Sequence, residues 1–219
     1  RVAVMCGRCI NMVANMWHSP EKAKWKTGAV GIGSSEACML GGVAAWLRWR
    51  ERRKAAGKPY DKPNLIISSA YQVVWEKFCQ LWQIEMRTIP ITHKHPTLNI
   101  EEVIETCDEN TICVVPIAGV TWTGMNDDIE ALNDALEQYN RITGYDIPIH
   151  VDAASGGFIL PFLKPEKKWD FRLKWVLSIS TSGHKYGLVY PGLGWVVWRD
   201  KTYLPAEMSF SVNYLGASI

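Results

Sequence analysis

The sequence lacks a long apolar run, and its charges nearly cancel. No run approaches the roughly 20 apolar residues that a membrane-spanning helix needs, and the first residues do not follow the basic, apolar and small-residue order of a signal peptide. The chain has 24 Lys and Arg residues against 22 Asp and Glu residues, and its net charge of +2 is too small to indicate nucleic acid or an anionic membrane as a partner. We therefore expect a cytoplasmic protein that binds no nucleic acid and no membrane.

Cysteines are few, and only two of the six lie close together. The segment Cys6-Gly-Arg-Cys9 has the spacing of half a zinc site or of a redox dithiol, but the sequence offers no second pair to complete four zinc ligands. Apolar residues recur at helical spacing through this segment, which favours two buried cysteines on a helix over both alternatives. His93 and His95 lie in a polar segment without a carboxylate cluster, so we expect no metal site there either.

The chain does contain a regular alternation of helical and apolar segments. Its 219 residues, of which 47% are hydrophobic, suffice for one large α/β domain. After helices over residues 2–17 and 34–56, joined by a loop to residue 33, the expected order is strand 64–68, helix 71–82, strand 84–89, helix 100–107, strand 111–117, helix 128–142 and strand 147–151. Two further strands, 175–180 and 193–198, come without a full helix between them. This order predicts three layers, with helices flanking a mostly parallel, mixed sheet.

Three polar residues follow ends of the expected strands. In open sheets of this kind ligands bind beyond the carboxyl ends of the strands, and Thr121, Asp152 and Lys185 each come after one of them. Three separate segments can thus deliver side chains to one crevice. Taken alone, Thr121 is typical of a turn and Gln72, near the start of its helix, is typical of a helix cap.

Lys185 is the candidate nucleophile. An amine in a pocket of low dielectric loses its proton more readily and can form an imine with a carbonyl group. The alternative is an ordinary surface lysine. Apolar strands on both sides, His184 immediately before, and Gly183 and Gly187, which permit a close backbone approach, argue for chemistry.

Asp152, in Val151-Asp-Ala-Ala154, is the candidate partner for a cation. A buried carboxylate is costly unless it meets a positive charge, and a protonated heterocyclic nitrogen is one such partner. A helix cap or a salt-bridged strand end is the alternative. Ala153 and Ala154 leave room for a flat ring nearby.

The segment from Gly31 to Glu36 is the candidate phosphate site. It opens a helix, and it offers backbone N–H groups and the hydroxyls of Ser34 and Ser35. Ordinary capping is a serious alternative, because either serine can cap the helix. Glu36 can also satisfy the same N–H groups, and it would repel a phosphate unless its carboxylate points away.

In this order, Gly33-Ser-Ser-Glu-Ala37, His150-Val-Asp-Ala-Ala-Ser-Gly-Gly-Phe158 and Ser182-Gly-His-Lys-Tyr-Gly187 resemble the pyridoxal-phosphate-dependent group II decarboxylases, and among these the members that act on glutamate. The resemblance covers nearly the whole chain. Supporting segments are Cys38-Met-Leu-Gly-Gly42, residues 55–59, 61–64, 107–111 and 169–173.

The resemblance implies the large domain of the fold type I, aspartate-aminotransferase-like enzymes, with pyridoxal 5'-phosphate as cofactor. It implies an internal aldimine on Lys185, a bond from Asp152 to the pyridine nitrogen, and Ala154 packed under the ring. Further implied contacts are Ser34, Ser35, Ser182 and His184 around the phosphate, Gln72 over the ring, and Thr121 beside the cofactor or near the substrate carboxylate.

The implied activity is decarboxylation of L-glutamate to γ-aminobutyrate and carbon dioxide. Another pyridoxal-phosphate-dependent decarboxylase or lyase, and a non-catalytic truncated remnant, remain open as alternatives. The resemblance also implies a homo-oligomer built on a dimer, which the eleven tryptophans favour through core and subunit contacts. Residues 1–219 are then expected to be a pyridoxal-phosphate-binding large domain, without the N-terminal segment and small C-terminal domain of such enzymes.

Overall fold

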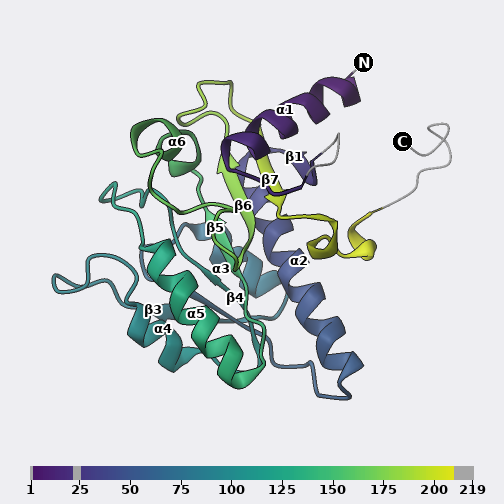
Figure 1. The fold of residues 1–219 in the computed structure, drawn as a ribbon, viewed down its shortest axis with the longest axis vertical. Helices are drawn as coiled ribbons and strands as arrows, with labels where there is room; N and C mark the ends of the chain where they lie inside the picture. The colour runs from purple at the N-terminus through teal and green to yellow at the C-terminus, as the bar shows by residue number, and fades with distance from the viewer. Residues whose placement is uncertain (1, 22–25, 210–219) are drawn as a thin grey trace.

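A twisted sheet forms the middle of the molecule (Figure 1). Across residues 2–21 and 26–209, which the computed structural model describes, the sheet has seven strands in the order β1-β7-β6-β5-β4-β2-β3. They are β1 (Gly28–Gly31), β2 (Asn64–Ser68), β3 (Glu85–Ile89), β4 (Thr111–Val115), β5 (Ile149–Asp152), β6 (Val176–Ser182) and β7 (Gly194–Trp198). Strands β2 to β6 pair in parallel, whereas β7 is antiparallel to both β6 and β1. The predicted mostly parallel, mixed sheet is confirmed.

Helices cover both faces of this sheet. One apolar core joins it to α1 (Val2–Met16), α4 (Ile100–Thr106), α5 (Ile129–Thr143) and α6 (Leu160–Leu163). A second core, on the opposite face, joins it to α2 (Gly33–Ala55) and α3 (Val73–Leu81). Short 3-10 helices lie at η1 (Gly156–Phe158), η2 (Lys201–Tyr203) and η3 (Ala206–Met208). The result is the predicted arrangement of three layers, with α4 and α5 side by side in Figure 1.

Strand β5 shows how the sequence divides between the two faces. Successive side chains of a strand point to opposite sides of the sheet. Ile149 and Val151 enter the core with α5, while His150 and Asp152 face α2 and α3. The two polar residues of this strand therefore lie on the same side, between the sheet and two helices.

The loop predicted before residue 33 contains a strand, so that prediction was wrong in part. Strand β1 has four residues, two of them glycines, which is too short and too small to show an alternating pattern. It is held by antiparallel pairing with β7. Residues 22–25 of the predicted loop lie outside the described residues. Strand β6 also continues past residue 180, because Thr181 and Ser182 pair with Trp195 and Gly194.

Helix α1 forms as predicted, but its cysteines are not buried. Cys9 is exposed and Cys6 is half-buried, and the helix buries Val13 and Ala14 alone. Helical spacing shows which residues share a face, and here most of that face meets no other described element. Its exposed apolar side chains include Val2, Val4, Met5 and Met12. Among the described residues, no helix combines the length and apolar composition that crossing a bilayer requires.

Candidate active site

The carboxyl ends of β4, β5 and β6 lie next to one another, because these strands are adjacent and parallel. The loop after β4 is fixed to the end of β5 by a hydrogen bond of 2.9 Å from the N–H of Ala118 to the carbonyl of Asp152. The N–H of Ala153 donates to the carbonyl of Ser180 in β6, also at 2.9 Å. The segments that carry Thr121, Asp152 and Lys185 thus leave the sheet at one edge.

Asp152 is buried, with 3% of its surface exposed. Its Oδ2 accepts a hydrogen bond of 2.8 Å from Nε1 of Trp75, and its Oδ1 accepts one of 3.1 Å from the N–H of Ala154. None of the ion pairs within the described residues involves Asp152. A buried carboxylate held by two neutral donors is costly unless a cation completes it, and a protonated pyridine nitrogen fits this environment.

Lys185 lies in the turn that follows β6 and is half-buried. Its Nζ lies 3.5 Å from Oγ of Ser155, which follows β5. Two glycines permit this turn. A Cβ atom at Gly187 would lie 2.6 Å from the carbonyl oxygen of Gly183, and one at Gly183 would lie 2.7 Å from the Val189 side chain. The missing side chains at these two positions let the turn pack closely as it brings the amine toward Ser155.

Cys38 of α2 connects the lysine and the aspartate electrostatically. Burial raises the pKa of its thiol well above the ordinary value, the negative charge of Asp152 raises it further, and Lys185 acts in the opposite direction. Its Sγ lies 3.2 Å from Oγ of Ser180. The buried thiol therefore lies where the charges of both predicted catalytic groups act on it.

The start of α2 is one of the two segments predicted to bind the phosphate. The prediction that Ser34 or Ser35 caps this helix was wrong, because the helix begins at Gly33 and both serines lie in its first turn. Ile32 is the N-cap residue and makes no side-chain capping bond. The carboxylate of Glu36 folds back and accepts the N–H of Ile32, so it does not point away from the predicted phosphate site. The N–H groups of the first helical turn have no intrahelical partner, as at any helix start.

Gly194 brings this helix start against the strands that lead to Lys185. A Cβ atom at Gly194 would lie 2.4 Å from the carbonyl carbon of Gly33 and 2.8 Å from the nitrogen of Ser34. Gly194 is paired in register with Ser182, whose Oγ lies 3.2 Å from Nδ1 of His184. The structure thus brings the two predicted phosphate-binding segments together at one point. Free N–H groups, hydroxyls and an imidazole are the donor set that a phosphate requires.

Gln72 and Thr121 meet above the end of the sheet. Nε2 of Gln72 donates a hydrogen bond of 2.7 Å to Oγ1 of Thr121, although 49 positions separate the two residues. Gln72 occupies the N-cap position of α3, as the alternative interpretation expected, but its side chain makes no capping bond. Ala154 is half-buried and its carbonyl accepts the N–H of Ser182 at 3.3 Å.

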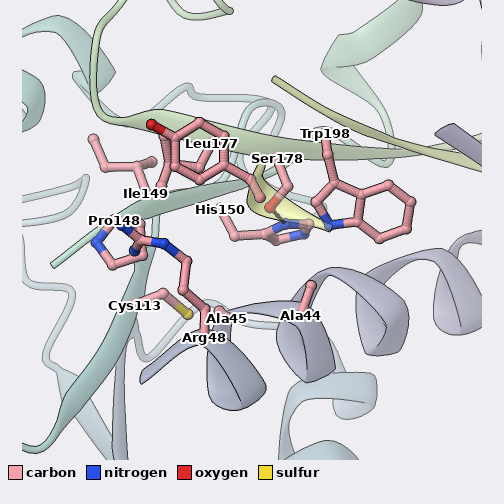
Figure 2. Close-up of a pocket in the computed structure, with 11 residues that line it drawn as sticks. Ala44, Ala45, Arg48, Cys113, Pro148, Ile149, His150, Leu177, Ser178 and Trp198 are labelled. Atoms are coloured by element: carbon pink, nitrogen blue, oxygen red, sulfur yellow. Dashed lines mark hydrogen bonds between the residues drawn. The ribbon is translucent and has the colours of Figure 1, made fainter. Parts of the chain in front are cut away.

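A separate small cavity lies between α2 and the sheet (Figure 2). It is lined by residues that include His150, Ser178 and Trp198, and its volume of about 10 Å³ is roughly the space of one water molecule. Burial lowers the pKa of His150 to about 3. This cavity is too small for an amino-acid substrate.

Fold and geometry together define a class. A three-layer α/β domain with a lysine after one parallel strand, a buried aspartate at the end of the next, and an open helix start beside them is built to hold a phosphorylated, nitrogen-containing cofactor. Residues 2–219 match the pyridoxal-dependent decarboxylase conserved domain, and the chain belongs to this family. Its cofactor is pyridoxal phosphate.

Similar proteins carry a more specific name. The chain is 57% identical to a glutamate decarboxylase of Lactococcus lactis subsp. cremoris, over 97% of this chain and 46% of that protein. It is 55% identical to glutamate decarboxylase beta of Listeria monocytogenes, over 100% of this chain and 47% of that protein. The solved structure of a Lactobacillus brevis glutamate decarboxylase superposes with a TM-score of 0.94 at 52% identity, over 99% of this chain and 49% of that one. The chain spans about half the length of the curated relatives it matches.

Several contacts at the site were not predicted from the sequence. Trp75 was covered only by the expectation that the tryptophans make core and subunit contacts, and Ser155 only by the segment 150–158 that carries the resemblance. Cys38 and Ser180 carried no pattern that points to a site. Each gains its place from a contact with a segment far away in the chain, which the spacing of residues along one segment does not encode.

Proposed function

We propose that this protein decarboxylates L-glutamate to γ-aminobutyrate and carbon dioxide, with pyridoxal phosphate held beyond the carboxyl ends of β4, β5 and β6. The observation that carries the proposal is the buried carboxylate of Asp152, which belongs to no ion pair among the described residues and ends the strand next to the one that Lys185 follows. The choice of glutamate is supported by the names of relatives that are 50% identical or more over nearly the whole chain.

In this proposal Lys185 attaches the cofactor and Asp152 holds the proton on its ring nitrogen. The bond from Lys185 to Ser155 keeps the amine directed at the end of β5. The small side chain of Ala154 leaves the adjoining space free for the ring. When bound, pyridoxal phosphate supplies an electron sink for the pair released as carbon dioxide departs. A fixed negative charge at Asp152 strengthens that sink by keeping the ring nitrogen protonated.

We assign the phosphate to the donors at the start of α2 and after β6. Ser34 and Ser35 offer N–H groups and hydroxyls, and the positive end of a 23-residue helix lies behind them. Ser182 and His184 supply two further side-chain donors from the neighbouring strand end.

Gln72 and Thr121 are proposed to border the ring and the substrate. The Gln72 amide donates to Oγ1 of Thr121, so the hydroxyl hydrogen of Thr121 is available to another acceptor. Thr121 is exposed, which fits a contact with a substrate carboxylate. Gln72 is half-buried and bonded to Thr121 in the loop after β4, which fits a position over the ring.

The test is turnover by the full-length gene product supplied with pyridoxal phosphate. We expect glutamate to yield γ-aminobutyrate and carbon dioxide, and Lys185→Ala to abolish both products together with the absorbance of the attached cofactor. Lys164→Ala, at an exposed lysine after α6, is the matched control and should retain them. A folded Lys185→Ala variant that keeps activity and absorbance contradicts the proposal. Products from aspartate or aromatic amino acids but not from glutamate would identify a different decarboxylase or lyase.

We also propose that residues 1–219 are the pyridoxal-phosphate-binding large domain of a longer, cytoplasmic enzyme that forms a homo-oligomer built on a dimer. Relatives about twice as long support the first point. Six free thiols support a reducing compartment. Exposed apolar side chains on α1 and after Lys185, among them Leu188 and Tyr190 at 89% and 92% exposed, support subunit contacts. Light scattering on the purified full-length protein measures the assembly, and a monomer contradicts that part.

A further inference from the structure

The indole of Trp75 lies directly behind Asp152. It is fully buried in α3, and its Nε1–H donates to Oδ2 of Asp152 at 2.8 Å. The other carboxylate oxygen accepts the N–H of Ala154, two residues further along the same segment. The bond from Ala154 ties the carboxylate to its own segment, whereas the bond from Trp75 ties it to helix α3. With a donor on each oxygen, the plane of the carboxylate is held and its remaining acceptor sites keep fixed orientations.

Two rings hold the indole in place. The His150 ring meets it edge-on at a centroid distance of 5.3 Å and an angle of 62°, and the Phe78 ring meets it at 6.0 Å and 83°. Such edge-to-face contacts fix the orientation of an aromatic ring as well as its position. The packing of these two rings therefore keeps the N–H of Trp75 directed at Asp152.

Adjacent glycines on α2 make room for these two rings. A Cβ atom at Gly41 would lie 2.2 Å from Cε1 of His150, and one at Gly42 would lie 2.7 Å from Cζ of Phe78. Both glycines belong to the segment Cys38-Met-Leu-Gly-Gly42, which supported the resemblance without a physical role. The structure shows their physical role: two residues without side chains leave space on α2 for the rings of His150 and Phe78, which support Trp75.

His150 supports the indole without adding charge. Its Nδ1 lies 2.7 Å from Oγ of Ser178 and its Nε2 lies 3.1 Å from Oγ of Ser180, so both ring nitrogens have partners. Figure 2 shows this ring between strand β5 and helix α2, beside Ser178 and Trp198. Burial keeps the imidazole neutral at physiological pH, since its pKa is lowered to about 3. A neutral ring beside Trp75 leaves the charge of Asp152 available to the cofactor.

We propose that Trp75 is a positioning residue, which holds the carboxylate of Asp152 in the orientation that meets the cofactor's ring nitrogen. The proposal rests on the function proposed for Asp152. Trp75 is buried behind the aspartate, so it acts through Asp152 rather than on the substrate. Its loss should therefore change how firmly the cofactor is held and how fast it reacts, with little effect on substrate binding.

The test compares two variants that each remove one buried indole N–H from full-length protein loaded with pyridoxal phosphate. Trp75→Phe keeps an aromatic ring and loses the bond to Asp152. Trp49→Phe is the matched control, because the Trp49 ring lies in the same apolar core and its Nε1 donates at 3.0 Å to the backbone carbonyl of Glu109. It therefore loses a bond to a neutral carbonyl instead of one to a carboxylate. We expect cofactor dissociation to be about tenfold faster in Trp75→Phe, since bonds to charged groups contribute about this much or more.

We expect kcat for glutamate to fall about tenfold in Trp75→Phe and KM to change less than about twofold, with both values near wild type in Trp49→Phe. Equal cofactor dissociation rates in wild type and Trp75→Phe overturn the proposal. If Trp75→Phe does not fold, 3-benzothienylalanine at position 75 retains the bicyclic shape without the N–H. Its cofactor dissociation rate is then compared with that of wild type, and equal rates again overturn the proposal.

A second background shows whether Trp75 acts through Asp152. In Asp152→Ala, which has no carboxylate to orient, adding Trp75→Phe should change cofactor dissociation less than about twofold. A tenfold effect in that background means that Trp75 acts by another route and overturns the proposal. Wild-type protein that binds pyridoxal phosphate but releases no carbon dioxide from glutamate would refute the proposed function alone, because the dissociation rates would still report on Trp75.

Discussion

His150 makes the folded protein sensitive to mild acid. The ring is fully buried between two serine hydroxyls, and burial lowers its pKa from 6.5 to about 3. In the unfolded chain the same side chain takes up a proton near its ordinary pKa. Below pH 6.5 the unfolded state therefore binds more protons than the folded state, and the free energy of unfolding falls as the pH falls toward 3.

The size of this effect follows from the two pKa values. Each unit of difference corresponds to about 1.4 kcal/mol, so His150 alone should remove about 2 kcal/mol of stability between pH 7 and pH 5, and about 3 kcal/mol by pH 4. A typical domain has only about 5–15 kcal/mol in total. The loss is large enough to be measured well above the range in which most carboxylates titrate.

Urea unfolding at several pH values between 7 and 4 measures the effect. His150→Gln keeps a polar side chain between the serines and cannot take up a proton, so its stability should fall about 2 kcal/mol less than that of wild type from pH 7 to pH 5. His95→Gln, at an exposed histidine, is the control and should follow wild type. Parallel curves for wild type and His150→Gln would refute the reasoning, because another group would then carry the acid sensitivity.

Two further predictions concern the packing around the site. Gly41→Ala should destabilise the fold by about 3 kcal/mol or more, because its Cβ would collide with the His150 ring. Gly57→Ala is the control: its Cβ meets no atom within 4 Å, and it should cost about 1–2 kcal/mol because Gly57 has a positive φ. Equal urea midpoints for the two variants would contradict this prediction. Asp127→Asn should cost about 1–3 kcal/mol at pH 7, because one amide oxygen cannot replace the carboxylate that accepts the N–H groups of Leu98 and Ile117. Burial raises the pKa of Asp127 above 3.8, so the contribution of its ionisation to stability decreases as the pH rises past 3.8. Asp127→Asn should lack this decrease. Stability curves with the same pH dependence for wild type and Asp127→Asn would contradict the raised pKa.

The sheet and the place of the proposed site residues at one edge of it were predictable because they follow local patterns. Lys185 and Asp152 each follow an apolar strand, and parallel neighbouring strands must end at one edge. The order of segments also predicted the reversed strand β7. These features depend on residues that are close in the sequence, where periodicity and turn residues are informative.

Features that depend on distant contacts were not predictable. The bond between Trp75 and Asp152 joins positions 77 residues apart, and no pattern within α3 distinguishes it from a core tryptophan. Ser34 and Ser35 were wrongly expected to cap α2, because the helix begins at Gly33 and both serines lie in its first turn. Cys9 was wrongly expected to be buried, since spacing identifies a face but not what covers it.

The pairing of β1 with β7 has a consequence for the order in which the protein folds. A strand at residues 28–31 finds its hydrogen-bonding partner only at residues 194–197, so the chain must close a very long loop before that pair can form. During synthesis β6 remains an open edge until β7 has emerged, and open strand edges invite pairing with other chains. The proposed cofactor site draws on residues from Ser34 to Lys185, so it cannot form until most of this chain has been made.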